Sequence, residues 1–139
     1  MKYSILRKTA VVLSVAVLSA INMYSQERAD IIKAYNDGVK QIQTNIDSAI
    51  LSFNNVIQMS EKAGESANDL KDKAVQVLPG LYLKSASSKF SAKKPATEIV
   101  SAAKQAVATA EKYNNAQVKE SAKNVLVQAY NRMGTEFFG

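Results

Sequence analysis

The stretch KDKAVQVLPGLY at residues 71–82 returns 48 residues later as KESAKNVLVQAY at residues 119–130. Identical residues occupy five equivalent positions: Lys71, Ala74, Val77, Leu78 and Tyr82 match Lys119, Ala122, Val125, Leu126 and Tyr130. The apolar members recur at intervals of three and four residues, which is the spacing of one face of an α-helix. This pattern predicts a chain built from repeated helical units.

A second match links the segments that precede these two stretches. Ser60-Glu61-Lys62 corresponds to Ala110-Glu111-Lys112 at an offset of 50. At the same offset, the apolar residues around Phe53 align with those around Ala103. Tyr35 lies 47 residues before Tyr82. Two helix types would then alternate along the chain. The alternative is that two amphipathic helices resemble each other by chance, because apolar spacing alone produces part of the match.

Hydrophobic spacing and capping residues predict five helices and no strand. The first covers about residues 27–44, with Ile31, Tyr35 and Gly38 on one side. Asn45 and Asp47 are turn and cap residues for the second helix. That helix carries an apolar stripe of Ala49, Ile50, Phe53, Val56 and Ile57. Lys62 lies in its last turn, and Gly64 closes it as a C-terminal cap.

The third predicted helix covers about residues 66–89 and contains Pro79-Gly80, where we expect a kink or a break. Residues 85–94 are polar and are interpreted as the helix end plus a loop. The fourth helix begins with Pro95 in its first turn, with Thr97 as an alternative cap, and ends at Asn114-Asn115. The fifth begins near Ala116.

The fifth helix carries Tyr130-x-x-Met133-Gly134-x-x-Phe137, which resembles the first-helix motif of tetratricopeptide repeats. Ala49-Ile50-x-x-Phe53 is similar to their second-helix motif, and residues 78–82 with 110–114 resemble a long-helix variant found in exported bacterial proteins. The resemblance covers residues 29–139. Three departures stand out: Ser85-Ala86 replaces the usual Leu-Gly, Ala103 replaces an aromatic residue, and the closing Pro is missing.

This resemblance implies an all-α fold of antiparallel helix pairs stacked into a right-handed superhelix, with about two and a half repeats. It also implies a groove that binds a peptide or a helix of a partner protein. Polar residues beside the repeated tyrosines are the candidate partner-binding positions: Asn36, Lys40, Lys84, Asn131 and Arg132. The tyrosines themselves are expected mainly in the core.

The last predicted helix carries apolar residues, and only one neighbouring pair of helices is available to cover them. Met133, Phe137 and Phe138 are therefore candidates for self-association, most simply as a homodimer. The alternative function is a structural or assembly role, in which the chain pairs with itself or joins an envelope complex. A third possibility is that the chain is a fragment of a longer repeat array.

The N-terminus has the features of a cleaved export signal. Lys2, Arg7 and Lys8 precede an uncharged apolar run at residues 10–21, which is shorter than a membrane-spanning helix requires. We expect residues 1–25 to be a signal peptide and residues 26–139 to be the repeat domain, in the periplasm or secreted. Cleavage after Ala20, or an uncleaved anchor, are the alternatives.

Composition excludes several chemistries and weakens others. The sequence has no His and no Cys, so it has no imidazole base, no thiolate ligand, no disulfide and no lipid-anchoring cysteine. We predict neither catalysis nor a cofactor or metal site. Without residues 1–25 the net charge falls from +6 to +3, which argues against nucleic-acid binding. Lys84, Lys89, Lys93 and Lys94 leave contact with an anionic surface or membrane open.

Overall fold

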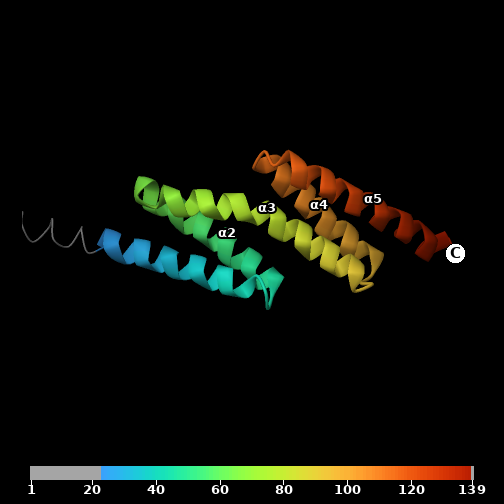
Figure 1. The fold of residues 1–139 in the computed structure, drawn as a ribbon, viewed down its shortest axis with the longest axis horizontal. Helices are drawn as coiled ribbons and strands as arrows, with labels where there is room; N and C mark the ends of the chain where they lie inside the picture. Colours follow the sequence, from blue (N-terminus) through green and yellow to red (C-terminus); the bar gives the residue numbers. More distant parts are fainter. Residues whose placement is uncertain (1–22, 139) are drawn as a thin grey trace, which may run out of the picture.

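The structure is a computed structural model that describes residues 23–138, and those residues form helices and short connections only (Figure 1). The elements are a first helix over 23–41, α2 (Ile46–Ala63), the 3-10 helix η1 (Gly64–Ala67), α3 (Asn68–Ser91), α4 (Ala96–Lys112) and α5 (Ala116–Phe138). No strand occurs in this part of the chain, which confirms the all-α prediction. The predicted signal peptide lies outside the described residues, apart from residues 23–25 in the first helix.

The predicted caps bound α2 at both ends. The side chain of Asn45 accepts a hydrogen bond of 3.0 Å from the backbone N–H of Ser48. Gly64 ends the helix at φ +72°, and its N–H bonds to the carbonyl of Ser60. A residue with a side chain rarely adopts that φ, so a glycine suits this position. Asn45 and Gly64 therefore set these boundaries, as the sequence predicted.

α3 runs through Pro79 as one helix, so the predicted break does not occur, and the alternative of a kink stays a prediction. Pro79 lacks an N–H and leaves the carbonyl one turn before it without a partner, a cost of about 3 kcal/mol in a helix interior. Burial of Leu78 and Leu81 on either side offsets this cost, since each buried side chain contributes roughly 2 kcal/mol. The predicted helix end plus loop at residues 85–94 agrees with α3 ending at Ser91, although Ser85 and Ala86 within it are buried rather than exposed.

α4 begins at Ala96, with Pro95 rather than Thr97 at its N-cap. Pro95 offers no side-chain acceptor, and a carboxylate from another helix supplies one. Glu136 of α5 accepts a 3.3 Å hydrogen bond from the backbone N–H of Ala96. A negative charge at this end of a helix is favourable because the N-terminus carries a partial positive charge. The helix ends at Lys112, before Asn114-Asn115 as expected.

α3 joins the two halves of the stack (Figure 1). Its first half packs on α2 around Phe53 and Leu78, in a core that also includes Ile31 of the first helix. Its second half packs on α4, and α5 lies against both. Arg28 of the first helix pairs with Asp69 at the start of α3, with hydrogen bonds of 2.9 and 3.0 Å. The first three long helices therefore form one packed group, and α3, α4 and α5 form the next.

Residues related by the sequence repeat occupy related positions in the packing. A Cβ at Gly38 would stand 3.2 Å from atoms of both Ser52 and Phe53, so the first helix approaches α2 closely there. Ala86 lies 48 residues after Gly38, and it packs on Ala102 and Ala103, which lie 50 residues after Ser52 and Phe53.

The next helix covers each of these contacts in the same way. Val77 and Leu78 of α3 pack with Phe53 in the first core. Val125 and Leu126 of α5, 48 residues later, pack against Ala86 and its neighbours. The match between 71–82 and 119–130 is thus a match in contacts as well as in sequence.

Candidate binding cleft

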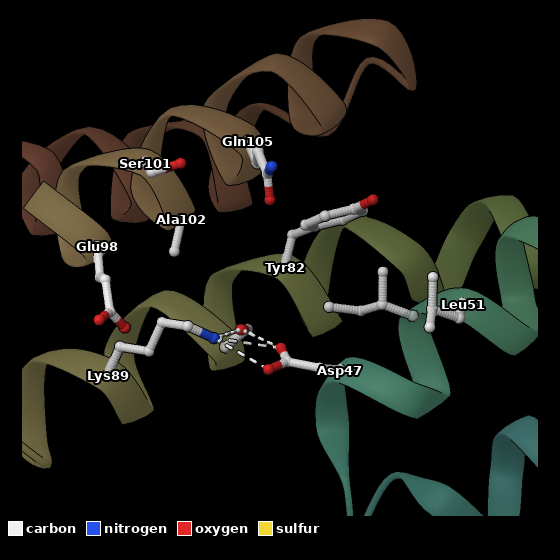
Figure 2. Close-up of a pocket in the computed structure, with 10 residues that line it drawn as sticks. Asp47, Leu51, Tyr82, Lys89, Glu98, Ser101, Ala102 and Gln105 are labelled. Carbon is white, nitrogen blue, oxygen red and sulfur yellow. Dashed lines mark hydrogen bonds and ion pairs between the residues drawn. The ribbon is translucent and has the colours of Figure 1, made fainter. Parts of the chain in front are cut away.

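A cleft of about 480 Å³ lies between α2 and α4, with α3 as its floor (Figure 2). Ten residues line it: Asp47, Ile50, Leu51, Tyr82, Ser85, Lys89, Glu98, Ser101, Ala102 and Gln105. It exists because α2 and α4 both pack on α3 without contacting each other. The geometry of the stack therefore creates this hollow between two helices of the same type.

One end of the cleft is held by a charged network between α2 and α3. The Ser85 hydroxyl donates to Asp47 at 2.7 Å, and the Lys89 ammonium donates to Asp47 at 3.1 Å and to Ser85 at 3.0 Å. The hydrogen bond from Ser85, followed by the one from Lys89, lowers the pKa of the Asp47 carboxyl below its ordinary value. Asp47 thus carries a negative charge near neutral pH, and Lys89 largely balances it.

The other end of the cleft is apolar. Leu51 of α2 is 70% exposed, although it belongs to a helix whose other large aliphatic residues are mostly buried. Tyr82 of α3 also lines the cleft, and its hydroxyl accepts a 3.2 Å hydrogen bond from the side-chain amide of Asn54. That bond holds the ring in place, so the apolar floor is formed before any ligand arrives.

The α4 wall presents polar groups that have no partner across the cleft. In the described part of the chain, the side chains of Glu98, Ser101 and Gln105 make no hydrogen bond to α2 or α3. All three are exposed. They are available to donate to or accept from the backbone or side chains of a bound segment.

The network at the charged end does not form a catalytic pair. A serine with a lysine one turn away is a known way to activate a hydroxyl, but the lysine must be neutral to accept the proton. Here Lys89 is the cationic partner of Asp47, and Ser85 donates to the same carboxylate while being only 4% exposed. The geometry suits binding rather than acyl transfer.

The five residues predicted from the sequence do not line this cleft. Asn36, Lys40 and Asn131 are exposed on other faces. Lys84 is exposed, and its ammonium lies 3.4 Å from the carbonyl of Ile42. Arg132 bonds to Glu136 at 2.8 Å and to the carbonyl of Lys93 at 3.3 Å, so it joins α5 to the loop before α4.

The four lysines that the sequence offered for contact with an anionic surface lie in different environments. Lys89 is paired with Asp47 inside the cleft, whereas Lys84, Lys93 and Lys94 are exposed. Sequence reasoning missed Leu51 and Glu98 as candidate ligand contacts. Leu51 carried a detectable signal, because it lies outside the apolar stripe of its own helix. Glu98 carried none, since a carboxylate in a first helical turn is common for helix stability alone.

Residues 23–138 contain no helix that is both long and apolar enough to cross a membrane. The same residues hold no group of three or more acidic side chains arranged to bind a metal ion. Comparisons of the chain with protein-family models, with curated proteins and with solved structures found no match.

Proposed function

We propose that this protein is an interaction module that binds a peptide or helical segment of another protein in the cleft between α2 and α4. The observation that carries the proposal is a cleft lined by the exposed Leu51 and the hydrogen-bonded Tyr82, with polar groups on its α4 wall that make no hydrogen bond to α2 or α3. An apolar anchor with a few convergent polar groups is the usual composition of a recognition site. A cleft of this size holds a few side chains rather than a whole domain.

The proposal includes a tetratricopeptide-like architecture of five helices in a right-handed superhelix. The equivalent contacts of Gly38 and Ala86 support it, because small residues at the closest approach of paired helices are what that family's packing requires. The edge-to-face contact of Tyr35 and Phe53, with ring centroids 5.4 Å apart, supports it further.

We also propose that the module acts outside the cytoplasm after cleavage of residues 1–25. The basic start, the apolar run and Ser25 support this. Mass spectrometry of the protein from the cell envelope or the medium tests it. The chain is expected to begin between Ala20 and Glu27, most often at Gln26, whereas a full-length chain in the soluble fraction would contradict export.

A peptide screen with the purified protein tests the binding site. Peptides selected from a random library are measured by calorimetry against the protein and its Leu51→Asp variant. The substitution places a carboxylate at the apolar end of the cleft, one helical turn from Asp47, and we expect binding to weaken by about tenfold or more. Val39→Asp is the matched control, because Val39 is an exposed aliphatic residue on the first helix that does not line the cleft. Equal losses in both variants, or no selected peptide, would overturn the proposal.

A second candidate function is self-association, or assembly into an envelope complex, through the uncovered face of α5. The observation that favours it is the exposure of Phe137 and Phe138, which are 70% and 94% exposed. Exposed large apolar side chains close together commonly mark an interaction surface.

A further inference from the structure

α5 is buried on one side only. Ala122 and Ala129 are its buried residues, and Met133 packs against Ile99 and Val100 of α4. The face next to this buried side, in its C-terminal half, carries Val127, Tyr130, Gly134 and Phe137, spaced three, four and three residues apart. Val127 is 57% exposed and Tyr130 is 40% exposed. That spacing is the seam by which one helix packs along another. We name these four residues the α5 seam.

Gly134 is the third of three small residues spaced 48 apart, after Gly38 and Ala86. The first two are covered: Gly38 by Ser52 and Phe53 of α2, and Ala86 by Ala102 and Ala103 of α4. A Cβ added at Gly134 would meet nothing within 4 Å. The repeat position that packs against the next helix at Gly38 and at Ala86 is therefore uncovered at Gly134 of α5.

We propose that a second copy of this chain covers the α5 seam, with the two α5 helices antiparallel about a two-fold axis near residue 132. This order places Tyr130 opposite Gly134 of the other copy, and Val127 opposite Phe137. Each large side chain then meets a smaller one, which a self-complementary interface requires. An aromatic residue over a glycine is the contact that Phe53 already makes with Gly38 inside the chain. The inference rests on the second candidate function.

The charges of α5 allow this pairing. Between residues 127 and 138 the only charged side chains are Arg132 and Glu136. They bond to each other, and they reach the carbonyl of Lys93 and the N–H of Ala96, so both face α4. Lys104 lies over the Tyr130 ring, 5.7 Å from its centroid, at one side of the seam. Two copies therefore meet without like charges opposed along the seam itself.

The position of α5 leaves room for a partner. α5 lies at one edge of the described part of the chain, with the first helix at the other, and its C-terminal end extends beyond α3 and α4 in this view (Figure 1). The seam spans ten residues, or about 15 Å of helix. A second copy can approach this end without displacing α3 or α4.

Analytical ultracentrifugation of the purified protein and two glycine variants tests the proposal. We expect a concentration-dependent dimer, and Gly134→Leu should weaken dimerisation by about tenfold or more because its side chain occupies the place of the partner's Tyr130. The variant should keep its helical circular dichroism, since nothing within 4 Å of Gly134 obstructs a side chain. Gly80→Leu is the control, because Gly80 is also helical and a side chain there meets no atom within 4 Å. The Gly80→Leu variant should dimerise as the wild type does.

Disulfide trapping tests the register, because the natural sequence has no cysteine. Val127→Cys and Phe137→Cys chains are oxidised separately and as a mixture. In the antiparallel pair, equivalent residues 127 lie about 15 Å apart along the axis, so only the mixture should crosslink efficiently. A monomer at all concentrations would overturn this inference together with self-association. A dimer that tolerates Gly134→Leu, or crosslinks through each cysteine alone, would overturn the proposed pairing and leave self-association standing.

Discussion

Phe53 of α2 lies directly against Gly38 of the first helix, with its Cε2 atom 3.2 Å from the place where a Cβ at residue 38 would stand. The contact fixes how closely the two helices approach, and the Phe53 and Tyr35 rings meet edge to face beside it. Helices come this close only where one of them carries a very small residue. Gly38 thus contributes space, at the cost of helix propensity.

Gly38→Val should destabilise the protein by about 1–3 kcal/mol, because the added methyls must displace the Phe53 ring in a packed core. Urea unfolding followed by circular dichroism measures the change. Gly80→Ala is the control, since its added methyl meets no atom within 4 Å. That substitution should stabilise α3 by up to about 1 kcal/mol through helix propensity alone. A stabilising Gly38→Val would show that the first helix and α2 are not in close contact in solution.

Pro79→Ala should stabilise the protein, because α3 continues through this position. Restoring the N–H removes a cost of about 3 kcal/mol, while the lost ring atoms reduce apolar burial by about 1–2 kcal/mol. The expected gain is therefore about 1–2 kcal/mol, read from the urea midpoint at unchanged slope. A loss of stability would indicate that Pro79 stabilises the junction with its neighbours more by packing than it costs in hydrogen bonding.

The helices were predictable where local chemistry sets their boundaries. Asn45, Gly64 and Asn114-Asn115 act within one turn of their own position, so the sequence alone identified those ends. The unbroken course of α3 at Pro79 and the burial of Ser85 were not predicted, for the opposite reason. Each residue disfavours a helix or a core position locally, and contacts from α2 and α4 override that preference. Such contacts join residues far apart in sequence and leave no mark in a local window.

The cleft was less predictable than the fold. It forms because α2 and α4 share α3 without touching, which depends on helix lengths and packing angles rather than on any motif. The repeated tyrosines led to candidate residues on α3, which does line the cleft, but on a face of that helix that does not. Tyr82 lines the cleft, whereas Lys84, two residues later, lies away from it. Because two residues along a helix turn the side chain by about 200°, a polar neighbour of a core tyrosine does not share its face.

Asp47→Asn should change how stability depends on pH. The lowered pKa of Asp47 means that its charged form stabilises the folded state. This contribution is complete above the unfolded aspartate pKa of about 3.9, and it disappears as the pH falls through the lower folded value. We therefore expect the wild type to have a higher free energy of unfolding than the variant near neutral pH. The difference should shrink below about pH 4.

The size of that difference is limited by exposure. The Asp47 side chain is largely exposed, so solvent screens the pair and the difference should stay below about 1 kcal/mol. Asp72→Asn is the matched control on α3, because Asp72 makes no ion pair among the described residues. Urea unfolding of all three proteins across the acid range measures the effect. A difference between wild type and Asp47→Asn that is constant with pH would mean that the Asp47–Ser85–Lys89 network does not form in solution.

Met133→Asp and Phe137→Asp should have different consequences, although both residues belong to the apolar end of α5. Met133 packs against Ile99, Val100 and Ala129, so a carboxylate there must be desolvated without a partner. We expect a loss of at least about 2 kcal/mol and partial separation of α5 from α4.

Phe137 is mostly exposed, and its replacement should change the stability of the single chain by less than about 0.5 kcal/mol. Phe137→Asp should nevertheless abolish the dimer, because it places two carboxylates in the seam, each opposite Val127 of the other copy. Light scattering for mass and urea unfolding for stability separate these effects. If Phe137→Asp unfolds the chain as Met133→Asp does, the end of α5 is part of the core and the seam is not a free surface.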